Sequence, residues 1–235
     1  MSDPAVSLAF FDTAHGLNGS ARSGVTLLFE GASPRTLAGK TTIERNGDAW
    51  RAHADEHLDL TFTAASPAAE LEGSTTCVCT VAGTLGGAPL ECLGTATETR
   101  TPPEWAELDA LRAVSAVFDT EHALLVLARR PRGALGHGQE EVSARLLQAG
   151  HLVDVEDARL STVYDGDGRQ RSAGVELWLP GEDFPRRASG IVQAGASLSL
   201  EGLRVNTAIF AWKMEGREGA GAYDLLARDE PDEAA

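Results

Sequence analysis

The stretch His57-Leu58-Asp59-Leu60-Thr61-Phe62-Thr63 alternates between polar and apolar residues at every position. Side chains on a β-strand point to opposite faces in turn, so Leu58, Leu60 and Phe62 share one face and the polar residues share the other. This pattern predicts a strand with one face in a core and the other in water. It therefore indicates a protein that is built from antiparallel sheets.

Short runs of similar character recur along the whole chain. Most are separated by Gly, Pro or Asp, and Asn46-Gly47-Asp48, Gly86-Gly87 and Asp165-Gly166-Asp167-Gly168 are typical of hairpin turns because Asn, Asp and Gly tolerate positive φ. So many short strands favour an antiparallel barrel or sandwich. Besides 57–63, we expect strands at 24–30, 75–82, 90–98, 139–147, 158–164, 173–179, 188–194, 197–200 and 204–213.

One segment near the middle breaks this pattern. Thr101-Pro102-Pro103-Glu104 places a hydroxyl at a helix N-cap, proline at the first helical position and Glu at the third, which is typical of a helix start. Trp105, Leu108 and Leu111 follow at near-helical spacing. We therefore expect a short helix over about 102–113, connecting two β-rich parts.

A repeated pentapeptide supports a division into two halves. Phe11-Asp12-Thr13-Ala14-His15 recurs as Phe118-Asp119-Thr120-Glu121-His122, and each copy stands near an apolar, strand-like run. Either the halves are related or the repeat is a coincidence, and a single long sandwich is the alternative architecture. We expect an N-terminal β half at 1–100, the helix at 101–114, a C-terminal β half at 115–228 and a disordered acidic tail at 229–235.

Composition narrows the class of partner. The 235 residues include 35 acidic and 20 basic ones, which gives a net charge of −15. Nucleic acid and anionic lipid are therefore disfavoured as partners, since both need a basic surface. No apolar run reaches the length of a membrane span and the N-terminus lacks a signal peptide pattern, so we expect a cytoplasmic protein.

Two motifs resemble metal-binding sites, but we expect a bound metal at neither. Cys77-Val78-Cys79 and Cys92 could converge on zinc, but paired thiols on a strand are more typical of a core. The Asp165–Gly168 turn is followed by Arg169 where a calcium loop needs an oxygen ligand. Phosphate-loop, dinucleotide and hydrolase motifs are also missing from the sequence, so no cofactor is expected.

The C-terminal segment of the chain is similar to a known pattern. Phe210-Ala211-Trp212 is followed by the glycine-rich stretch 215–223, which ends in Tyr223. Together with the halved β plan, this resembles the hydroxyneurosporene synthase family, also called the AttH-like family, as a remote and shortened relative. The resemblance implies two calycin-like barrels in tandem that bind or act on apolar, isoprenoid-like or polyketide-like molecules. The family's catalytic residues have no residue-by-residue match here.

The residues themselves suggest a pocket chemistry. If the interior of a barrel takes Glu176 and Trp178, it holds a carboxylic acid beside an aromatic wall, which suits proton-driven hydration or isomerisation of an alkene. His137, between two glycines, is the candidate partner of Glu176 in catalysis. In the alternative, Glu176 faces water. The candidate ligand-binding residues are Trp178, Arg187, Phe210, Trp212 and Tyr223.

Three functions remain open at this point. The first is a binding protein for a small apolar molecule, and the second is a cofactor-free hydratase or isomerase on an isoprenoid-like substrate. The third is a structural or interaction protein without a ligand cavity. A cavity larger than roughly 300 Å³ separates the first two from the third.

Overall fold

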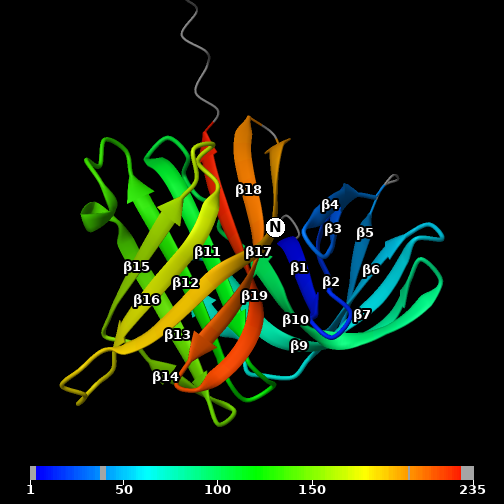
Figure 1. The fold of residues 1–235 in the computed structure, drawn as a ribbon, viewed down its shortest axis with the longest axis horizontal. Coiled ribbons are helices and arrows are strands. Elements are labelled where there is room, and N and C mark those ends of the chain that lie inside the picture. Colours follow the sequence, from blue (N-terminus) through cyan, green and yellow to red (C-terminus); the bar gives the residue numbers. More distant parts are fainter. Residues whose placement is uncertain (1–3, 38–40, 201, 229–235) are drawn as a thin grey trace, which may run out of the picture.

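Two curled antiparallel sheets form the protein, and they lie side by side in Figure 1. The structure is a computed structural model, and it describes residues 4–37, 41–200 and 202–228. The N-terminal sheet has the strand order β4-β3-β2-β1-β10-β9-β7-β6-β5, with β8 paired to β9. Its strands are β1 (Ala5–Asp12), β2 (Leu17–Arg22), β3 (Val25–Glu30), β4 (Ser33–Thr36), β5 (Thr42–Asn46), β6 (Ala49–Ala54), β7 (Leu58–Ala64), β8 (Ala69–Leu71), β9 (Ser74–Leu85) and β10 (Ala88–Thr99).

The C-terminal sheet repeats this plan. Its order is β14-β13-β12-β11-β19-β18-β17-β16-β15, which matches the first sheet strand for strand once β8 is set aside. A 3-10 turn, η1 (His137–Gln139), precedes β13. The strands are β11 (Leu108–Val117), β12 (Ala123–Pro131), β13 (Glu141–Gln148), β14 (His151–Asp154), β15 (Asp157–Tyr164), β16 (Gln170–Trp178), β17 (Arg186–Leu200), β18 (Leu203–Met214) and β19 (Arg217–Arg228).

The predicted all-β class with two calycin-like antiparallel halves is therefore confirmed. Each of the expected strand ranges overlaps an observed strand, and 188–194 and 197–200 belong to the one long strand β17. The Gly86-Gly87 hairpin connects β9 to β10, with φ of 59° and 80° at the two glycines, as a tight turn between twisted strands requires. The predicted tail at 229–235 lies outside the described residues.

The predicted helix over 102–113 is wrong. The proline-capped start forms only one turn, in which the N–H of Glu107 donates to the carbonyl of Glu104 at 2.9 Å, and β11 begins at Leu108. Every second residue of β11, from Leu108 through Arg112 to Ala116, is buried, so the segment follows a period of two. Pairing with β12 and β19 satisfies the backbone of β11, and this tertiary contact overrides the local helix signal.

The repeated pentapeptide occupies equivalent places in the two sheets. It ends β1 in one sheet and follows β11 in the other, at the turn into the next strand. In the first copy Nδ1 of His15 lies 2.8 Å from Oδ2 of Asp12, and in the second Nδ1 of His122 lies 2.9 Å from Oδ1 of Asp119. Both histidines therefore stabilise a turn together with their own aspartate.

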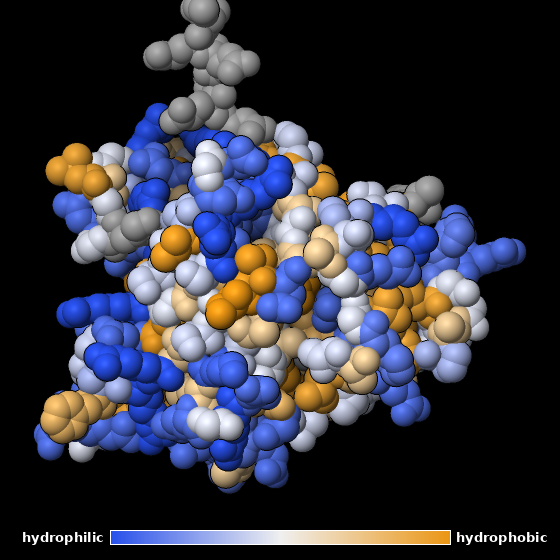
Figure 2. Space-filling model, viewed as in Figure 1, coloured by the Kyte–Doolittle hydropathy of each residue, from blue (hydrophilic) through white to orange (hydrophobic). Residues whose placement is uncertain are grey.

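Four clusters of buried residues form the core of the part of the chain that the structure describes. One fills the inside of each curled sheet, and two lie between the sheets: a larger one, where Phe11 and Phe29 meet Val117 and Ile209, and a small one of Ala69, Leu71 and Leu125. The face in Figure 2 is mostly hydrophilic or neutral, with hydrophobic residues in separate spots. Within the described residues, no helix has the length and apolar character to cross a membrane.

Candidate functional site

A cavity of about 380 Å³ lies at the junction of the two sheets, and we call it the central cavity. It is placed there by alternation, because the outer faces of β1, β2, β9 and β10 face those of β11, β12 and β19. Figure 1 shows β1, β10 and β19 side by side near the middle of the molecule. The lining residues are Ala5, Val6, Ser7, Ala9, Ser20, Arg22, Ser23, Leu71, Ser74, Thr76, Thr95, Thr97, Thr99, Leu111, Ala113, Val114, Ser115, Leu125, Val126, Leu127, Ala222, Asp224 and Leu226.

The two walls of the central cavity differ in chemistry. The C-terminal sheet supplies an aliphatic wall that includes Leu111, Leu125 and Leu226. The N-terminal sheet supplies mainly hydroxyl side chains, and four of them pair across β9 and β10: Thr76 with Thr97 at 2.9 Å and Ser74 with Thr99 at 3.0 Å. Because these four hydroxyls satisfy one another, this part of the wall can contact an apolar molecule at little cost.

A single ion pair crosses from one wall to the other. Nη2 of Arg22 on β2 lies 2.5 Å from Oδ2 of Asp224 on β19, and the two side chains are only 25% and 15% exposed. The other carboxylate oxygen, Oδ1 of Asp224, is buried and accepts no hydrogen bond from the described residues. The arginine thus fixes the carboxylate and leaves one acceptor available, beside an aliphatic surface.

Sequence reasoning missed Arg22 and Asp224. Tyr223 points into the interior of the C-terminal half, so alternation turns its neighbour Asp224 toward the other sheet. The sequence feature that could have pointed to this site is the single acidic residue in the run Ala222-Tyr223-Asp224-Leu225-Leu226. It was not decisive, because an outward residue normally faces water rather than a second sheet.

Three of the predicted ligand-binding residues come together inside the C-terminal half. The ring of Phe210 lies 5.5 Å from that of Trp212 and 5.5 Å from that of Tyr223, centroid to centroid. All three side chains are fully buried, and none lines the central cavity. They form a packed aromatic layer of the core, and their role toward a ligand stays a prediction.

A buried charge network covers this aromatic layer. Arg112, which is 1% exposed, donates to the hydroxyl of Thr162 at 2.9 Å and to the carbonyl of Leu160 at 3.1 Å, and it forms an ion pair with Glu140. The hydroxyl of Tyr223 lies 2.6 Å from that of Thr162, and burial raises the pKa of this tyrosine to about 12. The network ties β11 to β15, strands that share no ladder.

Glu176, Trp178 and Arg187 lie on the outer face of the C-terminal half. The interior takes Val175 and Leu177, so the condition under which Glu176 and Trp178 would line it is not met, and Glu176 points outward as in the alternative. Alternation defines the two faces of a strand but does not say which face is inside. Here the face with the two aliphatic side chains packs in the interior.

The two outward side chains instead contact arginines. Oε1 of Glu176 pairs with Nε of Arg187 at 2.9 Å, and the ring of Trp178 stacks with the guanidinium of Arg159 at 4.8 Å. Whether Glu176 acts in catalysis stays a prediction. The side chain of His137 lies outside the described part of the structure.

The two metal-like motifs lie in a core and in a turn. Cys77 and Cys79 are buried in the N-terminal core with their sulfurs 3.8 Å apart, and Cys92 is half-buried. Oδ1 of Asp165 accepts the backbone N–H groups of Asp167 and Arg169, as in an ordinary polar turn. The described residues contain no group of three or more His, Cys, Asp or Glu side chains that could hold a metal ion.

Comparison with known proteins shows the same architecture elsewhere. No family model and no curated protein matches the chain. Among solved structures, an AttH-like protein of Nitrosomonas europaea matches with a TM-score of 0.63 and 14% identity, over 97% of this chain and 93% of that one. Kievitone hydratase of Nectria haematococca matches with a TM-score of 0.60 and 11% identity, over 96% and 89%. At such identities the likeness shows a shared fold, so the chain has the tandem-barrel fold that these two proteins also have.

Proposed function

We propose that the central cavity binds a small apolar molecule of lipid-like or isoprenoid-like character. The observation that carries the proposal is an aliphatic wall that faces a hydroxyl wall on which four of the hydroxyls already pair with one another. The volume of about 380 Å³ exceeds the roughly 300 Å³ at which ligand pockets begin. The apolar body of a ligand lies along the leucines, and a hydroxyl on the ligand donates to Oδ1 of Asp224.

Filling the cavity tests this proposal. Ala113 lines the cavity and stands directly opposite Asp224 and Leu127 in the sheet, so the substitution Ala113→Phe occupies the space beside the carboxylate. The matched control is Ala106→Phe, at an exposed position in the turn before β11. Thermal unfolding checks that both variants fold.

Two measurements read out binding. Native mass spectrometry of protein purified from its own host should show a co-purifying apolar mass in wild type and in Ala106→Phe but not in Ala113→Phe. The fluorescence of the neutral probe N-phenyl-1-naphthylamine should follow the same order. The proposal is wrong if wild type carries no apolar mass and the probe binds all three proteins equally or none of them.

A second candidate, a cofactor-free hydratase, is favoured by Asp224. A carboxylate that is fixed by an arginine in a water-poor cavity can take a proton from a water molecule whose oxygen adds to one carbon of an alkene. The same carboxyl group then returns the proton to the neighbouring carbon, so water is added across the double bond and nothing else is consumed. An alkene conjugated to a carbonyl suits this order of steps. One structural neighbour carries the name of a hydratase.

Two substitutions decide which carboxylate takes part in such a reaction. With a conjugated enone as substrate and water labelled with oxygen-18, mass spectrometry detects the added label in the product. Asp224→Asn should abolish the label while it preserves binding of the apolar probe, and Glu176→Gln should leave the label unchanged. If Glu176→Gln abolishes the label and Asp224→Asn does not, Glu176 is the proton donor, as the sequence hypothesis has it, and the role of Asp224 is refuted.

A further inference from the structure

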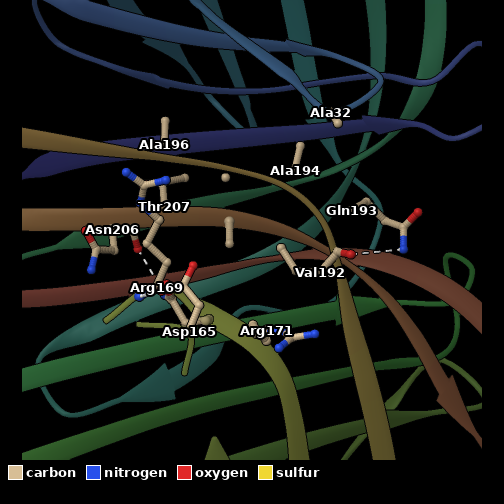
Figure 3. A pocket seen from close by; sticks show the side chains of 13 residues that line it. Ala32, Asp165, Arg169, Arg171, Val192, Gln193, Ala194, Ala196, Asn206 and Thr207 are labelled. Carbon is tan, nitrogen blue, oxygen red and sulfur yellow. Dashed lines mark hydrogen bonds between the residues drawn. The ribbon is translucent and has the colours of Figure 1, made fainter. Parts of the chain in front are cut away.

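A second hollow lies in the C-terminal half and shares no lining residue with the central cavity. Its volume is about 240 Å³, and we call it the end pocket. Figure 3 shows its walls: the turn between β15 and β16 brings Asp165 and Arg169, the start of β16 brings Arg171, and β17 brings the segment from Val192 to Ala196. Ala32, from the turn between β3 and β4, reaches it from the N-terminal sheet.

A β-bulge opens the sheet at this pocket. The register between β17 and β18 shifts between Val192 and Ala194, so Gln193 is an extra residue without a partner in the ladder. Its amide donates to the carbonyls of Ile191 and Val192, at 3.4 and 3.3 Å, which holds the bulge in shape. Bulges of this kind often lie beside functional sites because they re-aim side chains and interrupt pairing.

Two arginines of the end pocket are unpaired. Neither guanidinium, of Arg169 or of Arg171, forms a hydrogen bond or an ion pair with any residue that the structure describes, whereas Arg51, Arg186 and Arg187 all pair with carboxylates. Arg35 and Arg204 are also exposed and without such a partner among the described residues, so the lack of a partner does not by itself set this pair apart. Arg169 and Arg171 differ from these in that both line one hollow, together with Asn206, whose Oδ1 is buried without a partner among the described residues, and this combination points to a ligand.

The one carboxylate in the pocket is already engaged. Oδ1 of Asp165 accepts the backbone N–H groups of Arg169 and Asp167 at 2.8 and 2.9 Å. The hydrogen bond from the backbone of Arg169 lowers the pKa of Asp165 most, and the charges of Arg169 and Arg171 lower it further. Two guanidinium groups and one permanent carboxylate leave a net charge of one positive unit on the lining.

We propose that the end pocket binds the carboxylate of a small monoanionic molecule. A planar carboxylate matches the fork of a guanidinium and accepts two parallel hydrogen bonds from it. The apolar part of the ligand contacts Val192, Ala194 and Ala208, and a hydroxyl donor on it can meet Oδ1 of Asn206, which is buried and accepts no bond within the described residues. One net positive unit matches a monoanion better than a dianionic phosphate.

Benzoate is a suitable probe because it combines one carboxylate with a compact apolar body. Saturation-transfer NMR and calorimetry on the full chain should give saturable binding in wild type. Arg169→Gln and Arg171→Gln should each weaken this binding about tenfold, the effect of losing one charge-assisted hydrogen bond. The control is Arg204→Gln, at an exposed position of β18 that does not line the pocket. All three positions are exposed, so each variant should fold.

The outcomes separate the elements of the proposal. Benzoate binding that falls in both pocket variants and not in Arg204→Gln supports it. It is overturned if benzoate shows no saturable binding, if benzyl alcohol binds as tightly as benzoate, or if all three variants lose affinity alike. Inorganic phosphate that binds more tightly than benzoate at pH 8 overturns the assignment to a monoanion.

Discussion

Replacing Arg22 by methionine should destabilise the protein, because it leaves Asp224 without its partner between the two sheets. The pair is 2.5 Å apart, and the Asp224 side chain is 15% exposed. Breaking a fully buried ion pair costs about 3–5 kcal/mol. The Arg22 side chain is 25% exposed, so some water can replace it, and we expect a loss of about 2–3 kcal/mol.

The matched experiment removes both charges. Asp224→Leu alone leaves an arginine that can turn toward water, so its cost should be smaller than that of Arg22→Met. The double variant Arg22→Met with Asp224→Leu buries two apolar side chains in an apolar setting and should recover most of the loss. The cycle therefore predicts a coupling between the two positions of about 2–3 kcal/mol.

Urea unfolding followed by tryptophan fluorescence measures these differences. With a denaturant slope near 3 kcal/mol per molar, Arg22→Met should lower the midpoint by about 0.7–1 M. The double variant should unfold within about 0.3 M of wild type at an unchanged slope. If the double variant is as unstable as Arg22→Met, the loss comes from packing around the arginine and not from a stranded carboxylate, and the electrostatic account of the junction is refuted.

Three further predictions concern packing and titration. Gly221→Ala should abolish soluble expression, because its new Cβ collides with the carbonyl of Ser115 on the paired strand, whereas Gly136→Ala meets open space and should leave the melting temperature unchanged. Burial raises the pKa of Cys92 to about 12, so its thiol should resist iodoacetamide at pH 8 until urea unfolds the chain. Burial likewise raises the pKa of Tyr223 to about 12, so the folded state holds its proton more tightly than the unfolded chain does. Stability should therefore fall as the pH rises from about 10 to 12, and Tyr223→Phe should reduce that fall in a series of urea midpoints.

Much of the fold follows from local patterns in the sequence. Alternation as in 57–63 identifies a strand without reference to its neighbours, and pairs such as Gly86-Gly87 mark where two strands reverse. Long hairpins such as β9–β10 and β18–β19 are therefore predictable from their own residues. Pairing between distant strands, such as β1 with β10 and β11 with β19, has no local signal and depends on closure of each sheet.

The segment after Thr101 shows how a strong local signal fails. Its proline-capped start is real, since the chain makes one turn there. The apolar positions at 108, 111 and 114 fit a helix, but 108, 110, 114 and 116 fit a strand equally well. The deciding residue is Arg112, whose burial completes the alternation, and an arginine gives no hint of burial until its partners Glu140 and Thr162 are known.

The sequence pattern also fails at the candidate site, because the strands there are covered by protein on both faces. Strands at the junction are covered on both faces, so they lose alternation and read as continuous apolar runs, as in Leu124-Leu125-Val126-Leu127 of β12. Leu124 and Val126 face the interior of the C-terminal half, while Leu125 and Leu127 line the central cavity. A continuous run in a chain that otherwise alternates thus marks a strand between two layers. An acidic residue in such a strand has no water to face, so it needs a partner from the other layer, and Asp224 meets that need with Arg22.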